Sequence, residues 1–189
     1  MKFNLMIAGV GGQGTVLASK LIAAAAMKNG FDVRTTETIG MAQRGGSVFG
    51  HVRIGENIFS PLIPPGEADL IIGFEPAETV RQLSYLRGEG TVITCNKAVS
   101  TSGTNGMYAV SEMLNYLKAK APKLILIDGD RLTGQNAKTL NVSLLGAAAQ
   151  SGLFPFEAQK ILEVLPEVLP ARFLQMNLDA FETGRRLCQ

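Results

Sequence analysis

The sequence predicts an α/β fold, an open three-layer sandwich of Rossmann-like type with a mostly parallel sheet. Short apolar or β-branched runs, each closed by turn residues, alternate with segments of helical length, as in parallel strands joined by helical crossovers. The chain has 189 residues and 46% hydrophobic composition, which is enough for one buried core and too little for two full domains with linkers. We therefore expect a single domain over residues 1–189.

Five segments have the composition of strands. They are residues 3–8, 33–38, 69–74, 91–95 and 123–127. A first helix should start in the glycine cluster at 9–14 and end at Asn29-Gly30, because glycine favours a helix stop. Small and apolar residues recur along it at i, i+4, i+7 and i+8, so one face can pack closely on a sheet. Those residues are Leu17, Leu21, Ala24 and Ala25.

Residues 47–60 depart from this alternation of strands and helices. Every second residue from Val48 to Ile54 is valine, glycine or isoleucine, a period of two that indicates a strand. Gly55-Glu56-Asn57 then supplies a turn. We expect an antiparallel hairpin here, at an edge of the sheet.

The C-terminal third is predicted to be helical, because no strong strand pattern follows Ile127. Asn141 is expected to cap one helix, and Pro155 to open the next in its first turn. Residues 177–187 should form the last helix, with two arginines near its carboxyl end as the helix dipole favours.

Charge and cysteine content exclude several functions. Lysines and arginines number 18 against 16 acidic residues, and a net charge of +2 is too small for a nucleic-acid surface. The partners should therefore be a small molecule or another protein. Cys95 and Cys188 lie 93 positions apart, so we expect neither a disulfide framework nor a metal site or iron–sulfur cluster in this chain.

A membrane or export role is also not expected. No run approaches the roughly 18 to 20 apolar residues that cross a bilayer. The apolar segment after Lys2 is interrupted by Asn4 and the glycine cluster, unlike the continuous core of a signal peptide. We expect a soluble, cytoplasmic protein.

The spacing Gly9-x-Gly11-x-x-Gly14 between a strand and a helix favours an anion site, since free backbone N–H groups converge there. A tight crossover needs glycines for packing alone, so both interpretations stay open. A freestanding NAD-binding dehydrogenase is one alternative, with Glu37 on the ribose, 23 residues after Gly14. Against it, the chain offers a single histidine and no spare substrate domain.

No catalytic residue is assigned. His51 is interpreted as a structural histidine, exposed or hydrogen-bonded, on the alternating strand face. Glu75, Asp128 and Asp130 follow strands at positions typical of helix entries and turns, and their carboxylates would repel a phosphate.

A second unusual stretch, "ETIGMAQRGGSV" at 37–48, follows the second strand. Arg44 beside two glycines could clamp a phosphate or a partner's carboxylate with two hydrogen bonds. A solvated loop with a surface arginine is the other interpretation.

These stretches resemble the gamma-type component of the 2-oxoacid:ferredoxin oxidoreductases. The resemblance rests on "GVGGQG" at 9–14, "ETIGMAQRGGSV" at 37–48, "SPLIPPGEADLIIGFEPAE" at 60–78 and "NLDAFETGRRL" at 177–187. Together these motifs span nearly the whole chain in order. "GFEPAE" favours the indolepyruvate branch of the family over the pyruvate branch.

The resemblance implies a role inside a larger enzyme. In this family a 2-oxoacid is decarboxylated on thiamine diphosphate, electrons leave through iron–sulfur clusters to ferredoxin, and coenzyme A takes the acyl group. In the indolepyruvate type, a separate large subunit holds the thiamine site and the clusters, so this chain would contribute coenzyme A binding and assembly. Alternatives are the gamma subunit of a pyruvate, 2-oxoisovalerate or 2-oxoglutarate oxidoreductase, and a regulatory module that binds an adenine nucleotide.

The family pattern falls on two loops, expected to lie side by side at the carboxyl edge of the sheet. Its residues here are Gly11, Gly12, Gln13 and Gly14 in the first loop, and Gln43, Arg44, Gly45, Gly46 and Ser47 in the second. The pattern has a histidine where this chain has Ile39, and often a serine where it has Ala42. The identity of the 2-oxoacid is therefore left open.

Overall fold

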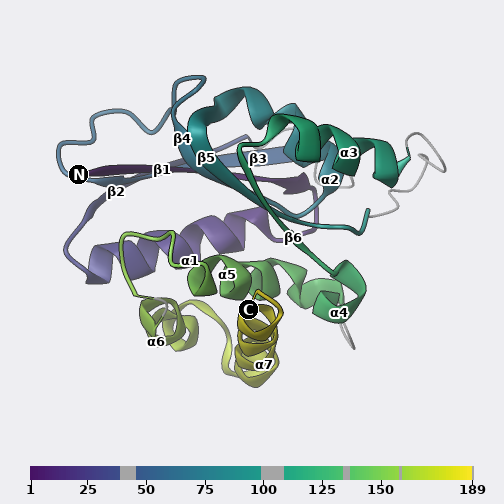
Figure 1. Cartoon of the computed structure of the whole chain (residues 1–189). Coiled ribbons are helices and arrows are strands. Elements are labelled where there is room, and N and C mark those ends of the chain that lie inside the picture. Colours follow the sequence, from purple (N-terminus) through teal and green to yellow (C-terminus); the bar gives the residue numbers. More distant parts are fainter. Residues whose placement is uncertain (39–45, 99–108, 134–136, 158, 189) are drawn as a thin grey trace.

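A computed structural model describes residues 1–38, 46–98, 109–133, 137–157 and 159–188. Its centre is a six-stranded sheet of order β2-β3-β1-β4-β5-β6 (Figure 1). The strands are β1 Lys2–Val10, β2 Asp32–Glu37, β3 Ser47–Gly55, β4 Ala68–Gly73, β5 Leu86–Cys95 and β6 Lys123–Ile127. All five strand segments expected from composition are present.

Among the described strands, β3 alone runs in the direction opposite to the other five. β1, β4, β5 and β6 pair in parallel, whereas β3 is antiparallel to both β1 and β2. The antiparallel element at 47–60 is thus confirmed, but its placement at an edge is wrong. β3 lies inside the sheet, and its hairpin partner is the preceding β2, while residues 56–67, between β3 and β4, form no strand. Both sides of β3 are hydrogen-bonded, which a local period of two cannot reveal.

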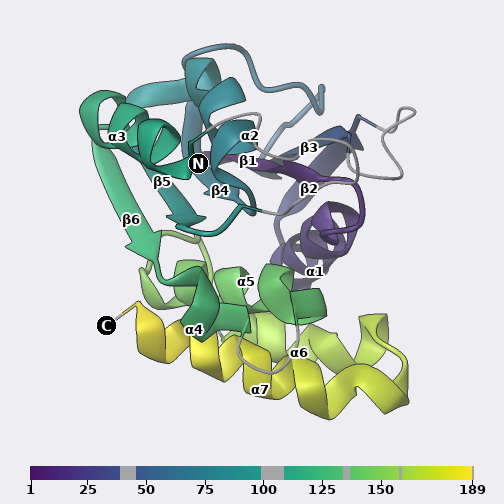
Figure 2. The same cartoon turned by 90° about the vertical axis from the view of Figure 1, so that its right-hand side faces the viewer.

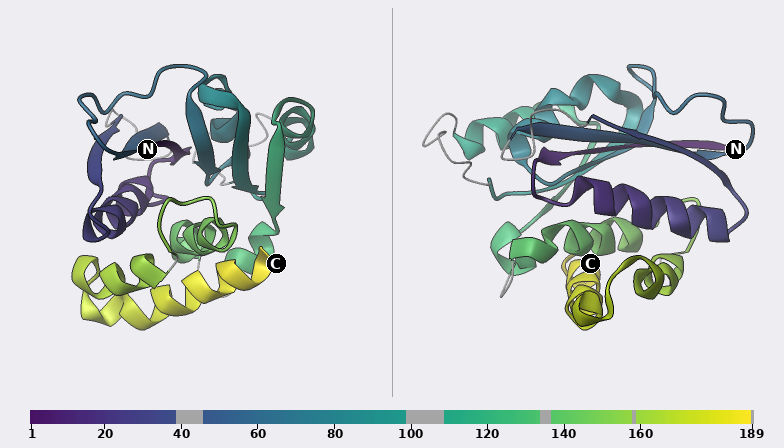
Figure 3. Two further views of the ribbon diagram at one scale, coloured as in Figure 1. Left: turned by 60° about the vertical axis from the view of Figure 1, so that its left-hand side comes forward. Right: turned by 180° about the vertical axis from the view of Figure 1, so that it is seen from behind.

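The helices form layers on both faces of the sheet. α2 and α3 cover one face, and α1 and α5 cover the other, which confirms the sandwich (Figure 1). The remaining helices α6 and α7 lie beyond α1 and α5, as a further layer (Figures 2 and 3). The helices are α1 Thr15–Lys28, α2 Pro76–Arg81, α3 Val110–Lys120, α4 Gly129–Thr133, α5 Leu140–Gln150, α6 Gln159–Val168 and α7 Ala171–Leu187, with short turns η2 Leu83–Tyr85 and η3 Ala137–Thr139.

Helix α1 buries more than one stripe because it packs between the sheet and α6. Leu21 and Ala25 on the predicted face are fully buried, while Leu17 and Ala24 are partly buried against the same core. Helix α5 is buried along nearly its whole length, since α7 covers the side that faces away from the sheet. This packing holds α1 and α5 against the sheet.

Three expectations for the C-terminal third need correction. Asn141 lies inside α5, where its side chain donates to the carbonyl of Gly14 in the glycine loop, and Thr139 is the N-cap. Pro155 lies in a bend before α6, which begins at Gln159. Helix α7 begins at Ala171, six residues before the predicted start, because Pro170 stands at the N-cap, where its missing N–H costs nothing.

Candidate functional site

The carboxyl edge of the sheet contains a reversal of winding between β1 and β4. These adjacent strands are parallel, yet α1 leaves β1 toward one face and α2 leaves β4 toward the other (Figure 1). In open α/β sheets ligands bind outside the carboxyl ends of the strands at such a reversal. The glycine loop follows β1 at this point.

The glycine loop has the backbone geometry of an anion site. Gly12 and Gly14 have φ of 96° and 78°, in the left-handed region that glycine adopts without strain. Gly14 is the N-cap of α1 and has no side chain to occupy the first N–H groups of the helix. A Cβ on Gly12 would meet no atom of the residues that the structure describes within 4 Å. The loop can therefore receive a negatively charged group.

The structure brings the described ends of the two predicted loops together. The N–H of Gly11 donates to the carbonyl of Gly46 over 2.8 Å, and Ser47 pairs with Val10 in the sheet. Gln43, Arg44 and Gly45 lie outside the described residues.

The side chain of Gln13 is used within the chain. Its Oε1 accepts from the N–H of Val10 over 2.7 Å, and its Nε2 donates to the carbonyl of Phe74 over 3.0 Å. The amide thus joins the ends of β1 and β4 at the winding reversal. Because both polar atoms of the Gln13 side chain are bonded within the chain, a ligand contact from Gln13 would come from its backbone.

Glu75 and Glu78 lie at the start of α2, beside the second loop. Oε2 of Glu75 accepts from the N–H of Glu78 over 2.9 Å, which confirms Glu75 as a helix-entry residue. Burial raises the pKa of the Glu75 carboxyl, and its Oε1 has no hydrogen-bond partner in the described part of the chain. Glu78 accepts from the hydroxyl of Ser47, a link that sequence reasoning missed.

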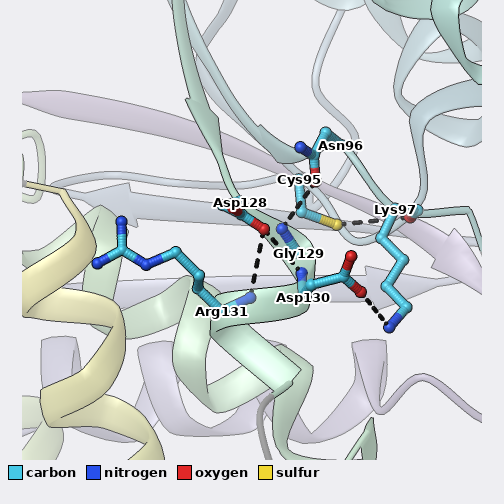
Figure 4. Close-up of polar contacts among 7 residues, drawn as sticks. All are labelled: Cys95, Asn96, Lys97, Asp128, Gly129, Asp130 and Arg131. Carbon is cyan, nitrogen blue, oxygen red and sulfur yellow. Dashed lines mark hydrogen bonds and ion pairs between the residues drawn. The ribbon is translucent and has the colours of Figure 1, made fainter.

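The ends of β5 and β6 carry the turn residues shown in Figure 4. Oδ1 of Asp128 accepts from the N–H groups of Asp130 and Arg131, and Asp130 pairs with Lys97 over 2.7 Å. Oδ1 of Asn96 accepts from the N–H of Gly129 over 2.8 Å. These contacts confirm the interpretation of Asp128 and Asp130 as turn and helix-entry residues.

The two cysteines are not paired with each other. Cys95 is buried, and burial raises the pKa of its thiol, which makes it a poor nucleophile. Within the described ranges, no three histidine, cysteine or acidic side chains are grouped so as to hold a metal ion, and no helix is long and apolar enough to cross a membrane.

His51 is a buried structural residue of β3. Its Nδ1 accepts from the N–H of Ile63 over 3.2 Å, and its ring makes edge contacts with Phe49 and Tyr85. Burial, with a smaller contribution from the nearby charge of Arg53, lowers the pKa of the imidazole. This confirms the hydrogen-bonded structural interpretation.

The lowered pKa of His51 makes stability depend on pH. The unfolded chain takes up a proton near the ordinary value of 6.5, whereas the folded chain stays neutral to a lower pH. The free energy of unfolding should therefore fall as pH drops through 6.5, and this fall should end below the lowered pKa. Urea unfolding at about pH 7.5 and about pH 5.5 measures it. His51→Gln keeps an acceptor for the N–H of Ile63 and should lose this pH dependence of the free energy of unfolding. An unchanged pH profile in that variant would show that the dependence comes from another group.

Comparison with known proteins places this geometry in a family. Residues 4–187 match the family described as pyruvate ferredoxin/flavodoxin oxidoreductase. The chain is 35% identical to the indolepyruvate oxidoreductase subunit IorB of Thermococcus kodakarensis, over 97% of this chain and 94% of that protein. It is 36% identical to the Archaeoglobus fulgidus subunit of the same name over the same shares. The common gamma subunit of the T. kodakarensis pyruvate/ketoisovalerate oxidoreductases is 30% identical over 92% of this chain and 90% of that protein.

Solved structures share the fold. A keto/oxoacid ferredoxin oxidoreductase gamma subunit from Geobacter sulfurreducens superposes with a TM-score of 0.72 over 98% of both chains, at 17% identity. The 2-oxoglutarate:ferredoxin oxidoreductase from Magnetococcus marinus, solved with 2-oxoglutarate, coenzyme A and succinyl-CoA, superposes with a TM-score of 0.73. That match covers 99% of this chain and 31% of the larger one, at 20% identity.

The fold defines an α/β domain of the gamma-subunit type, with a glycine loop at the carboxyl edge of its sheet. The chain belongs to the pyruvate ferredoxin/flavodoxin oxidoreductase family, and its relatives are subunits of 2-oxoacid oxidoreductases.

Proposed function

We propose that this chain is the small subunit of an indolepyruvate-type 2-oxoacid:ferredoxin oxidoreductase. One observation carries the proposal: identity to IorB subunits is 35–36% over 97% of the chain, against 28–31% over smaller shares for gamma subunits of pyruvate/ketoisovalerate enzymes. The reaction would convert an aryl pyruvate and coenzyme A to the acyl-CoA and carbon dioxide, with two electrons passing to ferredoxin. A cytoplasmic location remains a prediction.

The cofactors of oxidation would belong to a large partner subunit. Bound there, thiamine diphosphate supplies the decarboxylation and iron–sulfur clusters carry the electrons. In the described part of this chain, no three histidine, cysteine or acidic side chains are grouped as metal ligands, and the thiol of Cys95 is directed at the backbone carbonyls of Phe74 and Lys97. The role of this chain would be to bind coenzyme A and to complete the complex.

The glycine loop fits a phosphate group of coenzyme A. The first turn of α1, which no described side chain caps, would donate backbone hydrogen bonds, and no described residue covers Gly12 on the side where a phosphate would approach the main chain. Gly46 is held directly beside this loop by Gly11.

Arg44 is proposed to contact the same phosphate or the partner subunit. Arg44→Ala should weaken coenzyme A affinity, or assembly of the complex, by about 1 to 3 kcal/mol, the range for losing a charge-assisted hydrogen bond. Calorimetric titration and copurification measure the two effects. Arg34→Ala, on the exposed strand β2, is the control. If both variants bind and assemble like the parent chain, Arg44 does not belong to the site.

Titration with coenzyme A, NAD and ADP separates the alternatives. Tight binding of NAD without binding of coenzyme A would favour a freestanding dehydrogenase, and selective binding of ADP would favour a regulatory module. Assembly is tested by co-expressing this chain with a large subunit that carries clustered CxxCxxC motifs. A stable copurified complex is expected; its absence with every such partner from the same genome would contradict the subunit role.

A further inference from the structure

The geometry points to Glu78 as a positioning residue for the glycine loop. Glu78 is buried in the first turn of α2, after β4, whereas Ser47 begins β3, two strands away in the sheet. The hydroxyl of Ser47 donates to Oε2 of Glu78 over 2.5 Å. This bond joins residues that lie 31 positions apart in the chain.

Helix α2 is a rigid base from which Glu78 reaches the start of β3. The hydroxyl of Thr79 donates to the carbonyl of Glu75 over 2.7 Å and lies 3.2 Å from the hydroxyl of Thr94 on β5. Thr94 in turn donates to the carbonyl of Gly73 at the end of β4 over 2.9 Å. These buried bonds tie the start of α2 to β4 and β5, so Glu78 meets Ser47 from a helix that is anchored to the sheet.

The contact continues from Ser47 to the glycine loop through one peptide unit. The carbonyl of Gly46, next to Ser47, accepts from the N–H of Gly11 over 2.8 Å. Gly11 precedes the left-handed Gly12, whose conformation turns the loop toward α1. Fixing Ser47 therefore fixes the point where the glycine loop leaves β1.

A buried carboxylate in this place costs free energy of folding unless hydrogen bonds and counter-charges compensate it. The Glu78 side chain is 9% exposed and follows a second buried carboxyl, that of Glu75, by three residues. Its one cationic partner among the described residues is Arg81, 3.3 Å away and 67% exposed, so solvent weakens that pair. Because solvent weakens that pair, the hydrogen bond from Ser47 is, within the described ranges, the contact left to compensate the burial of the Glu78 carboxylate.

We propose that the Ser47–Glu78 bond holds Gly46 against Gly11 and thereby sets the shape of the glycine loop that binds ligand. The effect on coenzyme A rests on the function proposed above, whereas the effect on the loop does not. Two measurements separate these parts.

The first measurement is hydrogen exchange of the Gly11 amide in the full chain, followed by NMR. Glu78→Ala and Ser47→Ala should each lower its protection about tenfold, and the double variant should add little more, because both remove one bond. Glu78→Gln and Ser47→Thr keep an acceptor and a donor and should restore protection. Glu182→Ala is the matched control, since it removes an exposed carboxylate paired with an arginine three residues on. Unchanged protection at Gly11 in both alanine variants would overturn the proposal.

The second measurement uses the complex with the large subunit. The alanine variants should raise KM for coenzyme A about tenfold and leave kcat within about twofold, because the chemistry belongs to the partner. A fall of about tenfold in kcat with an unchanged KM for coenzyme A would overturn the link from the loop to ligand binding. If the parent complex needs no coenzyme A, the proposed function fails, and the exchange of Gly11 still decides the role of Glu78. Should Glu78→Ala fail to fold, Ser47→Ala removes the same bond at smaller volume change.

Discussion

Replacing Gly184 by alanine is expected to destabilise the protein by about 3 kcal/mol, the upper part of the range for overpacking a core. A Cβ on Gly184 would lie 1.7 Å from the carbonyl oxygen of Ser143 in α5. Helix α5 cannot move away, because it is buried between the sheet and α7. The close crossing of these helices also depends on Gly146, whose Cβ would lie 2.0 Å from the carbonyl oxygen of Phe181.

Denaturant unfolding measures this effect, with Gly88→Ala as the control. Gly88 is an exposed residue of β5, and a Cβ added there would meet no atom of the described ranges within 4 Å, so alanine should change stability by less than about 0.5 kcal/mol. Equal stabilities for the two variants would mean that α5 and α7 can separate without loss.

Gln13→Ala is expected to cost roughly 2 to 4 kcal/mol, because it removes one hydrogen-bond partner from each of two backbone groups at the strand ends. The N–H of Val10 and the carbonyl of Phe74 would each lose a hydrogen bond of 3.0 Å or less. The glycine loop would also lose the tie between β1 and β4, so affinity for a ligand at the loop should fall together with stability.

The control for Gln13 is Gln175→Ala, which removes an exposed bond to Asp179 on α7. Gln13→Glu refines the result, since a carboxylate still accepts from Val10 but repels the carbonyl of Phe74. Its free energy of unfolding should fall clearly below that of the parent. A Gln13→Ala protein as stable as the Gln175→Ala protein would show that water satisfies both backbone groups.

Local signals predict the parts of the fold that depend on neighbours in sequence. Strand β6 has the predicted bounds at 123–127, and α1 ends beside the expected Asn29-Gly30 stop. The position of β3 could not be predicted, because its pairing with β1 joins residues more than 35 positions apart. Period two identifies a strand without saying which strands flank it.

The candidate site, too, is predictable only where its signals are local in the sequence. The glycine spacing and the resemblance indicate two loops at one edge, and the bond between Gly11 and Gly46 agrees with that arrangement. Asn141 has the sequence signal of a helix cap, because it is a polar residue before an apolar run. Its contact with Gly14, 127 residues away, exists only once α5 packs beneath the glycine loop.

The contact between Ser47 and Glu78 leaves no signal in the sequence. The two residues are 31 positions apart, and their side chains meet only because Ser47 is in register with Val10 and α2 starts directly after β4. From the sequence alone, Ser47 would be interpreted as a loop serine and Glu78 as a glutamate in the first turn of a helix. The structure assigns them one shared contact.

The central claim is that this chain completes a 2-oxoacid oxidoreductase of the indolepyruvate type. The most direct measurement is viologen reduction by the co-expressed complex with indolepyruvate, phenylpyruvate, pyruvate and 2-oxoglutarate, each with and without coenzyme A. We expect reduction that requires both subunits and coenzyme A and is fastest with an aryl pyruvate. Equal rates from the large subunit alone, or no reduction with any of the four acids, would contradict the claim.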